Sequence, residues 1–565
     1  MDSRTAALVA GIRENIIGRD RALQGPWGPR RITYADYTAS GRSLRFIEEF
    51  IDREVRPLYA NTHTETSLTG LQTTRFREDA REMIRETVGG TDADVVIFTG
   101  SGATGAINKL IDILNLRLPA DLDARYGLSE RIPPEERPVV FIGPYEHHSN
   151  ELPWRESIAD VVLIDEDADG RIDRRQLQAE LERYAGRPLK IGSFSAASNV
   201  TGIVSDTHGI SALLHRHGAL AFWDFAAAAP YVRIDMNPPA GEDPLSYKDA
   251  VFISPHKFVG GPGTPGVLVV KRKLVANTVP TVPGGGTVRF VNRFEHDYLT
   301  DPAHREEGGT PAIIESIRAG LVFALKRAVG EANIEALERR LVDRAIAAWS
   351  DEPNIEILGN VSAQRLSIVS FVIRHGRRLL HHNFVVALLN DLFGIQARGG
   401  CSCAGPYGHR LLGIDLQRSI RYHEAIEHGC EGIKPGWVRV NFNYFISDAT
   451  ADFIIEAVRL IARDGWQLLP WYRFDHTTGI WRHRENPAHR EMSLRDVTFA
   501  PGELQYTADH TWEPASALPR YLEEARRILA EAAATPPDPV PEPPLPDDVE
   551  RLRWFPLPGE GVAAG

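Results

Sequence analysis

Short apolar runs alternate with helical patterns through the first half of the chain. Five of these runs have the length and the β-branched or aromatic content of strands that are buried on both faces: residues 138–143, 189–194, 219–223, 250–253 and 266–270. Helical patterns, such as residues 211–217, lie between them. This alternation predicts an α/β fold of three layers, in which helices cover a mostly parallel sheet.

Residues with useful chemistry follow several of these strands. Lys257 comes after residues 250–253, Asp224 ends the strand that begins at residue 219, and Thr104, His147 and Asn199 hold similar places. Ligands of such sheets bind at the carboxyl ends of the strands. We therefore expect these five side chains to line one site.

The length of the chain, 565 residues, exceeds what one hydrophobic core usually supports. We expect an N-terminal segment of a short helix and a loop (1–33), a large domain (34–326) and a smaller C-terminal α/β domain (327–464). Residues 117–137 read as a surface insertion, and residues 313–349 as a long helix. No internal repeat is apparent.

Residues 465–565 form an extension of different composition, rich at first in Trp, His, Arg and Pro. A helix is predicted at about 515–534, and residues 536–546 are typical of a polyproline arm or linker. The sequence assigns no role to this extension.

Composition limits the classes of partner that the chain is expected to bind. A formal net charge of −12 gives no electrostatic footprint for nucleic acid or for an anionic membrane, and no apolar run is long enough to span a bilayer. Three cysteines, Cys401, Cys403 and Cys430, do not make a disulfide framework. We expect a cytoplasmic protein whose partner is a small molecule or another protein.

A Gly-rich segment, residues 99–105, joins a strand at 95–98 to a helix that is expected to begin near Gly105. Small residues at a helix N-terminus expose backbone N–H groups, which can cradle a phosphate. The alternative is an ordinary Gly-rich turn, because short glycine motifs are weak signals. The segment lacks the Walker lysine and the full dinucleotide pattern, so a nucleotide is not favoured.

Asp224 and Lys257 carry the strongest chemical signal. A carboxylate at the end of an apolar strand needs a cationic partner, and a protonated pyridine nitrogen would serve, although an arginine would serve as well. Lys257 supplies an amine that can condense with a carbonyl cofactor, whereas taken alone it could be a solvated loop lysine. Together with the phosphate cradle, the pair favours a cofactor that has a carbonyl, a pyridine ring and a phosphate.

These residues resemble a known family. The chain is similar to fold type I pyridoxal-phosphate enzymes of the class V aminotransferase superfamily, and most of all to group II cysteine desulfurases and selenocysteine lyases. The matching motifs occur in the family's order between about residues 34 and 464: Tyr59-Ala-Asn-Thr-His63, Gly102-Ala-Thr-Gly-Ala-Ile-Asn108, Glu146-His-His-Ser-Asn150 with Pro153-Trp154, Ser198-Asn-Val-Thr-Gly202, Asp224-Phe-Ala226, Ser254-Pro-His-Lys257, Gly308-Gly-Thr-Pro311, Arg398-Gly-Gly-Cys-Ser-Cys-Ala404 and Val438-Arg-Val440.

The resemblance implies a role for each matching residue. Lys257 would bind pyridoxal 5′-phosphate (PLP) covalently, with His147 stacked on the ring, Asp224 at the ring nitrogen and Asn199 at the phenolic oxygen. The residues that would bind the phosphate are Ala103, Thr104, Ser254 and His256, and Thr310 would reach it from the neighbouring subunit, which implies a homodimer.

The substrate side is assigned in the same way. Arg439 would clamp the substrate carboxylate, with Arg398 nearby and His63 lining the substrate side. Taken singly, both arginines are also compatible with plain surface charge, so their assignment depends on the resemblance more than that of Lys257 does.

Cys403 selects the reaction, because it stands where the resembling desulfurases carry the cysteine that accepts sulfur. The resemblance implies that L-cysteine becomes L-alanine, that the sulfur passes to Cys403 as a persulfide, and that a sulfur-acceptor protein can follow. A neighbouring arginine favours the thiolate by lowering a thiol pKa from about 8.5. The alternative is a buried structural thiol. A metal site built with Cys401 and Cys430 lacks a fourth ligand at sensible spacing, so no metal is expected.

Three departures from the family pattern limit the substrate assignment. Ala227 stands where a glutamine is usual, Cys401 replaces another polar residue and could pair with Cys403 or pass sulfur onward, and the segment 407–435 is longer than usual. A class V aminotransferase, an epimerase or another carbon–sulfur lyase with the same cofactor site therefore remains an alternative. A catalytically silent scaffold is a second alternative, but it would not need Lys257 and Asp224.

Overall fold

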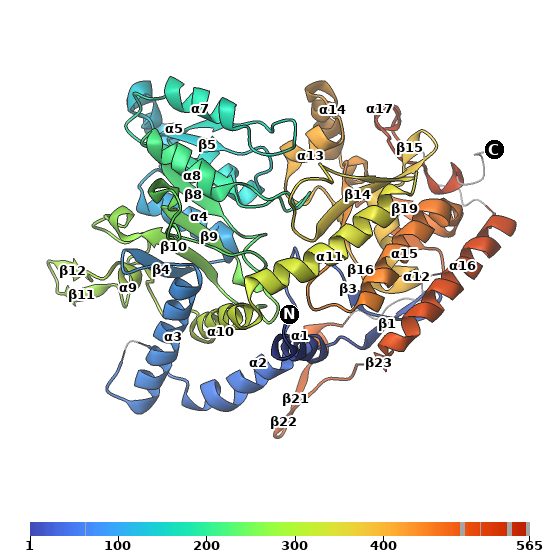
Figure 1. Cartoon of the computed structure of the whole chain (residues 1–565), viewed down its shortest axis with the longest axis horizontal. Helices are drawn as coiled ribbons and strands as arrows, with labels where there is room; N and C mark the ends of the chain where they lie inside the picture. The colour runs from blue at the N-terminus through green and yellow to red at the C-terminus, as the bar shows by residue number, and fades with distance from the viewer. Residues whose placement is uncertain (63, 486–491, 509, 539–544, 561–565) are drawn as a thin grey trace.

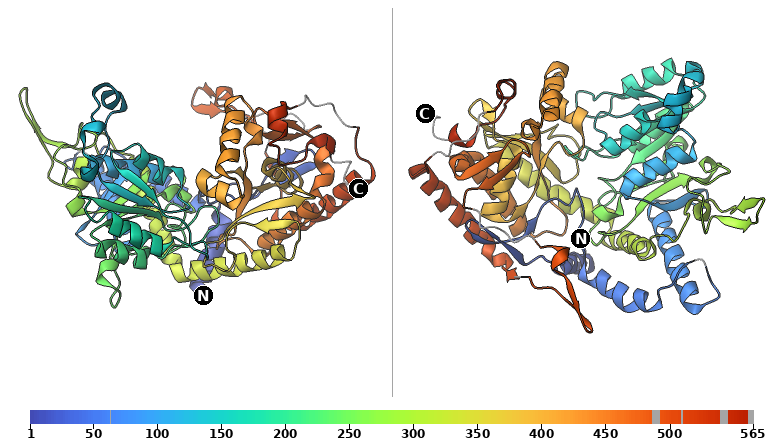
Figure 2. Two further views of the ribbon diagram at one scale, coloured as in Figure 1. Left: turned by 90° about the horizontal axis from the view of Figure 1, so that it is seen from above. Right: turned by 180° about the vertical axis from the view of Figure 1, so that it is seen from behind.

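The computed structural model describes residues 1–62, 64–485, 492–508, 510–538 and 545–560. Two lobes lie side by side, and the colour change from green to yellow in Figure 1 and Figure 2 follows the chain from one to the other. His63 and residues 539–544 of the expected polyproline arm lie outside the described residues. Among the described helices, none has both the length and the apolar character needed to cross a membrane.

A seven-stranded sheet forms the centre of the first lobe. All its strand pairs are parallel except those of β10, which runs antiparallel to both of its neighbours. The five runs expected as buried strands are all found here, so the prediction of an α/β fold with a mostly parallel sheet is confirmed. In spatial order the strands are β4 (Asp94–Thr99), β10 (Gly266–Lys271), β9 (Ala250–Ile253), β8 (Leu220–Asp224), β7 (Lys190–Ser195), β5 (Val139–Ile142) and β6 (Asp160–Leu163).

Both faces of this sheet are buried, which gives the lobe its three layers. Alternate residues of β9 belong to different cores: Val251 and Ile253 lie in one hydrophobic cluster, while Ala250 and Phe252 lie in the other. The helix α4 (Gly102–Ile113) packs in the second cluster, and α3 (Leu68–Thr87), α8 (Thr207–Arg216) and α10 (Ile313–Val329) pack in the first. Strands buried on both sides explain why the apolar runs are continuous.

The second lobe is built on a smaller antiparallel sheet of β13 (Ile355–Ile357), β14 (Ile368–His375), β18 (Trp437–Asn441) and β17 (Arg398–Gly400), with β15 (Arg378–Leu379) paired to β14. Its core is shared by helices α11 (Glu331–Ser350), α12 (His382–Phe393) and α15 (Asp448–Asp464). The helix expected in the extension is α16 (Leu518–Ala534), which packs into this same core. The extension therefore contributes directly to the second lobe.

Two local expectations were wrong. The helix expected over residues 313–349 is broken into α10 and α11 at Gly330, whose φ of +83° is one that residues with a side chain rarely adopt. The N-terminal loop contains an antiparallel hairpin of β1 (Arg21–Gly25) and β2 (Gly28–Arg31), after the expected short helix α1 (Ser3–Asn15). Because β1 also pairs with β23 (Thr511–Trp512), part of what fixes the hairpin lies near the far end of the sequence.

Candidate active site

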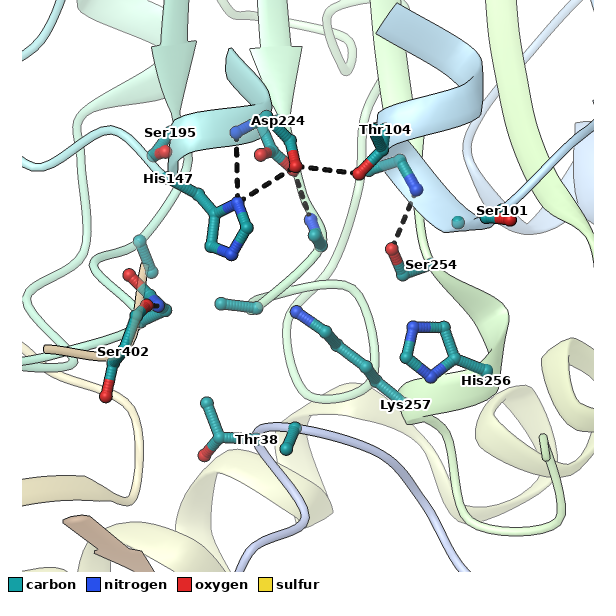
Figure 3. Close-up of a pocket in the computed structure, with 18 of the residues that line it drawn as sticks. Thr38, Ser101, Thr104, His147, Ser195, Asp224, Ser254, His256, Lys257 and Ser402 are labelled. Carbon is teal, nitrogen blue, oxygen red and sulfur yellow. Dashed lines mark hydrogen bonds between the residues drawn. The ribbon is translucent and has the colours of Figure 1, made fainter. Parts of the chain in front are cut away.

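A cavity of about 200 Å³ lies at the carboxyl ends of β7, β8 and β9, beside the N-terminus of α4 (Figure 3). The five residues that were expected to share a site, Thr104, His147, Asn199, Asp224 and Lys257, all line it. Five further predicted site residues line the same cavity: Ala103, Ser254, His256, Arg398 and Arg439. The structure therefore brings residues from Ala103 to Arg439, far apart in the sequence, into one place.

The wall of the cavity at α4 has the form of an anion cradle. The helix begins at Gly102, three residues earlier than expected, and its second residue, Ala103, donates its backbone N–H to Ser254 Oγ over 2.8 Å. Gly102 has φ +55°, and a Cβ there would lie 2.8 Å from Ser254 Oγ, so the turn requires glycine. A helix N-terminus and hydroxyl groups around a turn without side chains can bind a phosphate.

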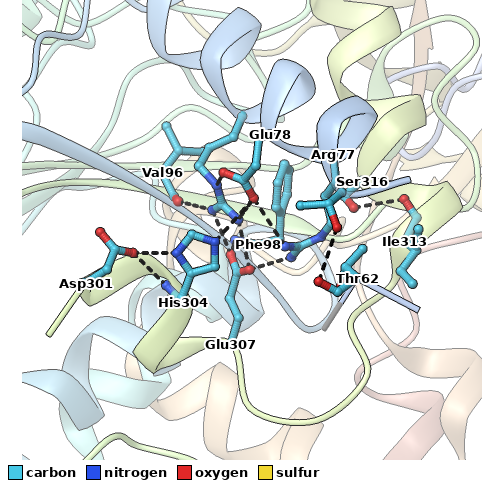
Figure 4. Close-up of polar contacts among 12 residues, drawn as sticks. Thr62, Arg77, Glu78, Val96, Phe98, Asp301, His304, Glu307, Ile313 and Ser316 are labelled. Carbon is cyan, nitrogen blue, oxygen red and sulfur yellow. Dashed lines mark hydrogen bonds and ion pairs between the residues drawn. The ribbon is translucent and has the colours of Figure 1, made fainter. Parts of the chain in front are cut away.

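A buried ion-pair network fixes the strand that leads into this cradle (Figure 4). Glu307 accepts the backbone N–H of Phe98 in β4 over 2.7 Å and pairs with Arg77 and Arg81 of α3. Burial raises the pKa of this carboxyl, but the two guanidinium groups outweigh burial and hold the pKa below its ordinary value. Glu307 therefore ties β4 and α3 to the segment that contains Thr310.

His147 lies over the middle of the cavity, in the turn between β5 and Asn150. Its Nδ1 accepts the backbone N–H of Ser149 over 3.1 Å, which places the ring proton on Nε2. Burial, followed by the positive charge of Lys257, lowers the pKa of His147 to about 3, so the ring is neutral at physiological pH. A neutral, fixed imidazole suits ring stacking. Ser149, whose hydroxyl lies 2.7 Å from that of Thr104, joins this turn to the cradle and was missed from the sequence.

Asp224 and Lys257 face each other across the buried end of the sheet. Asp224 is 5% exposed, and within the described residues the one hydrogen bond to its carboxylate comes from the backbone N–H of Ala226, over 2.7 Å. Burial raises the pKa of Asp224. Burial also lowers the pKa of Lys257 to about 8, although Asp224 opposes that change. A buried carboxylate with one neutral donor can accept a cationic group, and a lysine with a lowered pKa is a nucleophile near neutral pH.

The two arginines predicted to bind substrate lie on adjacent antiparallel strands, with Arg398 opposite Arg439. Arg439 is 3% exposed, and it donates to Asp36 Oδ1 and to the carbonyl of Asn199, each over 3.0 Å. Arg398 lies 3.4 Å from the other oxygen of Asp36. Asp36 was missed as a functional residue. Its place in the segment 34–40 gave no sign of this role, and only the fold shows that it meets both arginines.

Cys403 stands at the rim of the cavity, exposed, while its neighbour Ser402 is part of the lining. The loop is held on two sides. The carbonyl of Cys403 accepts the backbone N–H of His148 over 2.9 Å, and the carbonyl of Ser402 accepts the amide N–H of Asn199, also over 2.9 Å. Ser402 and Cys403 have φ of +52° and +56°, in the left-handed region that side chains disfavour. The hydrogen bonds on both sides maintain this strained turn beside the cavity.

The remaining predicted residues lie elsewhere. Thr310 is exposed, outside the cavity, and accepts a hydrogen bond from Asn61. His63 lies outside the described residues, so its expected place on the substrate side stays a prediction. Cys430 is buried in the core of the second lobe, whereas Cys401 packs against a core of the first. Within the described part of the chain, no three His, Cys, Asp or Glu residues are grouped so that they could hold a metal.

Comparison with known proteins gives the family. The family model for aminotransferase class-V matches residues 33–422, more than half of the chain. The chain belongs to this family. It is thus a PLP-dependent class V enzyme. The matched region includes the phosphate cradle, Asp224 and Lys257.

Individual relatives agree with the family. Among curated proteins, a probable cysteine desulfurase of Halalkalibacterium halodurans is 28% identical over 379 residues, which cover 66% of this chain and 84% of the relative. A probable cysteine desulfurase of Streptomyces coelicolor is 26% identical over 381 residues, with coverage of 66% and 84%. In both comparisons, about a third of this chain is not aligned with the relative.

Solved structures show the same fold. The apo structure of cysteine desulfurase from Thermococcus onnurineus NA1 has a TM-score of 0.61 at 21% identity, covering 76% of this chain and 95% of that one. The cysteine desulfurase CsdA (S-sulfonic acid) from Escherichia coli has a TM-score of 0.58 at 22% identity, covering 80% and 97%. The fold type I architecture expected from the motifs is confirmed.

The residues present fit PLP. Gly102 leaves the space and the exposed N–H groups that a phosphate needs, and Asp224 offers a buried oxygen to a protonated ring nitrogen. Asn199 has a second amide hydrogen besides the one given to Ser402, while its own Oδ1 is buried without a hydrogen-bond partner. Lys257 extends into the same cavity (Figure 3).

Proposed function

We propose that this protein is a cysteine desulfurase, which converts L-cysteine to L-alanine and takes the sulfur onto Cys403 as a persulfide. The observation that carries the proposal is the position of the Cys403 loop. Its backbone is hydrogen-bonded to the His147–His148 turn on one side and to Asn199 on the other, both in the walls of the cavity that holds Lys257. An exposed thiol at this rim can reach a sulfur atom that projects from a substrate bound inside.

The cofactor would be held by groups already in place. Asp224 would bind the ring nitrogen, His147 would stack on the ring, Asn199 would donate to the phenolic oxygen, and Lys257 would attach covalently. Thr104, Ser254 and His256 with the amide of Ala103 would surround the phosphate. When bound, PLP supplies an electron sink that makes removal of a proton from the α-carbon feasible. Burial, followed by the charge of Lys257, lowers the pKa of His256 to about 4, so this ring would bind phosphate as a neutral donor.

Lys257 and the two arginines would divide the work on the substrate. Arg439 and Arg398 would bind the carboxylate of L-cysteine, which directs the α-hydrogen toward the Lys257 amine. That amine, with a pKa lowered to about 8, accepts the α-proton and can later return a proton. Asp36 pairs with both arginines and offsets one of their two positive charges before substrate arrives, so the substrate carboxylate must compete with it or share its partners.

The sulfur step uses one thiolate and leaves one persulfide. The Cys403 thiolate attacks the substrate sulfur, so a bond forms between the two sulfur atoms while the carbon–sulfur bond of the substrate breaks. The bonding pair stays with the carbon skeleton, which takes up a proton and leaves as L-alanine. No external oxidant is required, because the sulfur is transferred and the carbon skeleton receives its electrons.

The proposal also covers the oligomeric state, the cellular location and the protein that accepts the sulfur. Exposure of Thr310, outside the cavity of its own chain, supports a homodimer in which it serves the neighbouring subunit. The three cysteines are free thiols, which supports the cytoplasm. The exposed position of Cys403 supports a protein that accepts the persulfide sulfur.

Two alternatives are separated by experiment. A class V aminotransferase, epimerase or different carbon–sulfur lyase would use Lys257 without Cys403, and a silent scaffold would use neither. We expect the purified protein to show a visible cofactor band that is lost in Lys257→Ala, which would exclude the scaffold.

The deciding assay incubates the holoenzyme with L-cysteine and a thiol reductant, and measures sulfide and alanine. Wild type should form both in equal amounts, and Cys403→Ser should retain the cofactor band while losing turnover by at least about a hundredfold, as expected for a lost nucleophile. Cys401→Ser is the matched control, since it makes the same change two residues away. Unchanged turnover in Cys403→Ser would contradict the persulfide mechanism while leaving the cofactor site in place.

A further inference from the structure

A second cavity, of about 280 Å³, lies between the N-terminal segment, the second lobe and the start of the C-terminal helix region. It shares no lining residue with the active-site cavity. Its walls come from α1, residues 16–20, residues 31–42 from the end of β2 onward, residues 445–450 and residues 514–515, which meet near the N-terminus in the lower centre of Figure 1. This cavity, called the N-terminal cavity below, plays no part in the proposed reaction.

Four guanidinium groups and one carboxylate line the N-terminal cavity: Arg13, Arg19, Arg31, Arg42 and Asp20. Arg19 and Arg31 both pair with Asp20. Within the described residues, Arg13 and Arg42 form no ion pair. Arg13 donates to the carbonyls of Phe445 and Ile446, and Arg42 to that of Ile17. Such an excess of positive charge is unusual in a chain with a formal net charge of −12, and it suits an anionic ligand.

The rest of the lining is mainly aromatic or aliphatic, with aliphatic hydroxyls at Thr33, Ser447 and Thr450. Tyr34 and Phe445 supply flat apolar surface, and the guanidinium of Arg42 lies over the Tyr34 ring at 5.2 Å. Thr33 is 3% exposed, and its Oγ1 is buried without a hydrogen-bond partner. Buried polar atoms are nearly always hydrogen-bonded, so this hydroxyl is an exception beside the cavity.

The N-terminal cavity is joined to the active site by a single short segment. Tyr34 and Tyr37 line the N-terminal cavity, Thr38 and Ala39 line the active-site cavity, and Asp36 lies between them. Asp36 is the carboxylate that holds both substrate arginines. A ligand that packs against Tyr34 and Tyr37 would therefore fix Asp36 on Arg439.

We propose that the N-terminal cavity binds a small organic anion, a phosphate or carboxylate carried on an aromatic or similarly flat body, and that the bound anion weakens substrate binding through Asp36. Guanidinium groups bind the anion, and the tyrosine and phenylalanine rings bind the body. Binding is independent of the proposed function, whereas the effect on substrate rests on it.

The binding test titrates the PLP-loaded protein with phenyl phosphate by isothermal calorimetry. We expect one equivalent to bind per chain, with an affinity that falls at high salt, and no binding of the neutral analogue benzyl alcohol. The double variant Arg19→Gln/Arg42→Gln should weaken binding by at least about tenfold. Arg183→Gln removes one positive charge from an exposed side chain of another helix and should bind as wild type does.

Two results would overturn binding at this place: no saturable heat with the wild type, or equal affinity in the double variant and Arg183→Gln. The variant Arg398→Gln tests for binding in the active site instead, because loss of the heat there would place the anion on the substrate arginines.

The coupling is tested by kinetics, in which phenyl phosphate should raise KM for L-cysteine at unchanged kcat in wild type and not in the double variant. A KM that does not change would overturn the coupling, and a protein that binds phenyl phosphate but does not turn over L-cysteine would contradict the proposed function alone.

Discussion

Lys257 shows how burial prepares one residue for chemistry. In the cavity, burial is the largest cause of its lowered pKa, and the nearby arginines lower it further against the opposing charge of Asp224. The same residue on a surface would be a nearly permanent cation. The neutral amine that attachment of a carbonyl cofactor requires is thus available near neutral pH.

The pH dependence of cofactor attachment follows from this pKa. Below pH 8 the Lys257 amine is mostly protonated, so the rate at which the cofactor-free protein takes up PLP should rise about tenfold for each pH unit, and level off above pH 8. Stopped-flow absorption at the visible band measures that rate. A free lysine derivative reacting with the same PLP is the control, and its rate should continue to rise toward pH 10.5. A protein profile that follows the free lysine would contradict the prediction.

At the residue scale, the sequence predicted most of the residues discussed here that line the cavity. Lys257, Asp224, His147, Asn199 and Thr104 could be placed together because each follows a recognisable strand of a parallel sheet, and such ends meet at one edge. Asp36, Ser149 and Ser402 were missed. Their contacts depend on how a turn or an opposite lobe approaches the cavity, and no periodicity in the sequence carries that information.

At the level of elements, the phosphate cradle depends on the strand and helix that frame it. Glu307 has a side chain that is 4% exposed, and it binds two arginines of α3 as well as the backbone of β4 (Figure 4). Removing one partner of a buried ion pair costs more than the pair itself contributes, since it leaves the other charges unpaired.

The variant Glu307→Gln should therefore lose about 3–5 kcal/mol of folding free energy, measured by urea unfolding. It should also release PLP more readily, measured as loss of the visible band on dialysis, because Phe98 lies directly before the turn of the cradle. The control is His304→Gln in the same network (Figure 4), whose side chain is 48% exposed and should cost within about 1 kcal/mol. Equal stability of the two variants would contradict a structural role for Glu307.

Elements were predicted well where their pattern is local. The buried strands were found because runs such as residues 250–253 are apolar throughout, and α16 because its periodic pattern stands between prolines. The hairpin of β1 and β2 could not be found, since β1 pairs with β23 from the opposite end of the chain. The break at Gly330 is a local signal that the apolar periodicity on either side concealed.

Over the whole molecule, the end of the chain supports the region that follows Cys403. The long segment after this cysteine folds into α13 (Gly405–Leu411) and α14 (Leu416–Glu427). Residues near the C-terminus hold it in place: the Leu552 carbonyl accepts from Tyr422 of α14, and Trp554 Nε1 donates to the carbonyl of Ile433 over 2.9 Å. The C-terminal extension is thus connected, within the second lobe, to the segment that follows Cys403.

The phenylalanine beside this contact allows a direct test. Phe555 is 1% exposed in the second core, and Phe555→Ala should cost about 3–5 kcal/mol of local stability by leaving a cavity. Hydrogen exchange should then become faster in α14 and around Ile433, while the strands of the first lobe keep their protection. Phe499→Ala removes the same side chain at a site that is 81% exposed and should change neither.

The same two variants test whether the C-terminal extension affects the proposed reaction. If the tail positions the Cys403 loop through α13 and α14, Phe555→Ala should retain the cofactor band and lose sulfide formation from L-cysteine, because Lys257 and Asp224 belong to the other lobe. Phe499→Ala should retain both. If hydrogen exchange in α14 becomes faster while sulfide formation is undiminished, the C-terminal extension does not position Cys403. The hydrogen bonds to His148 and Asn199 would then be sufficient to hold the Cys403 loop in place.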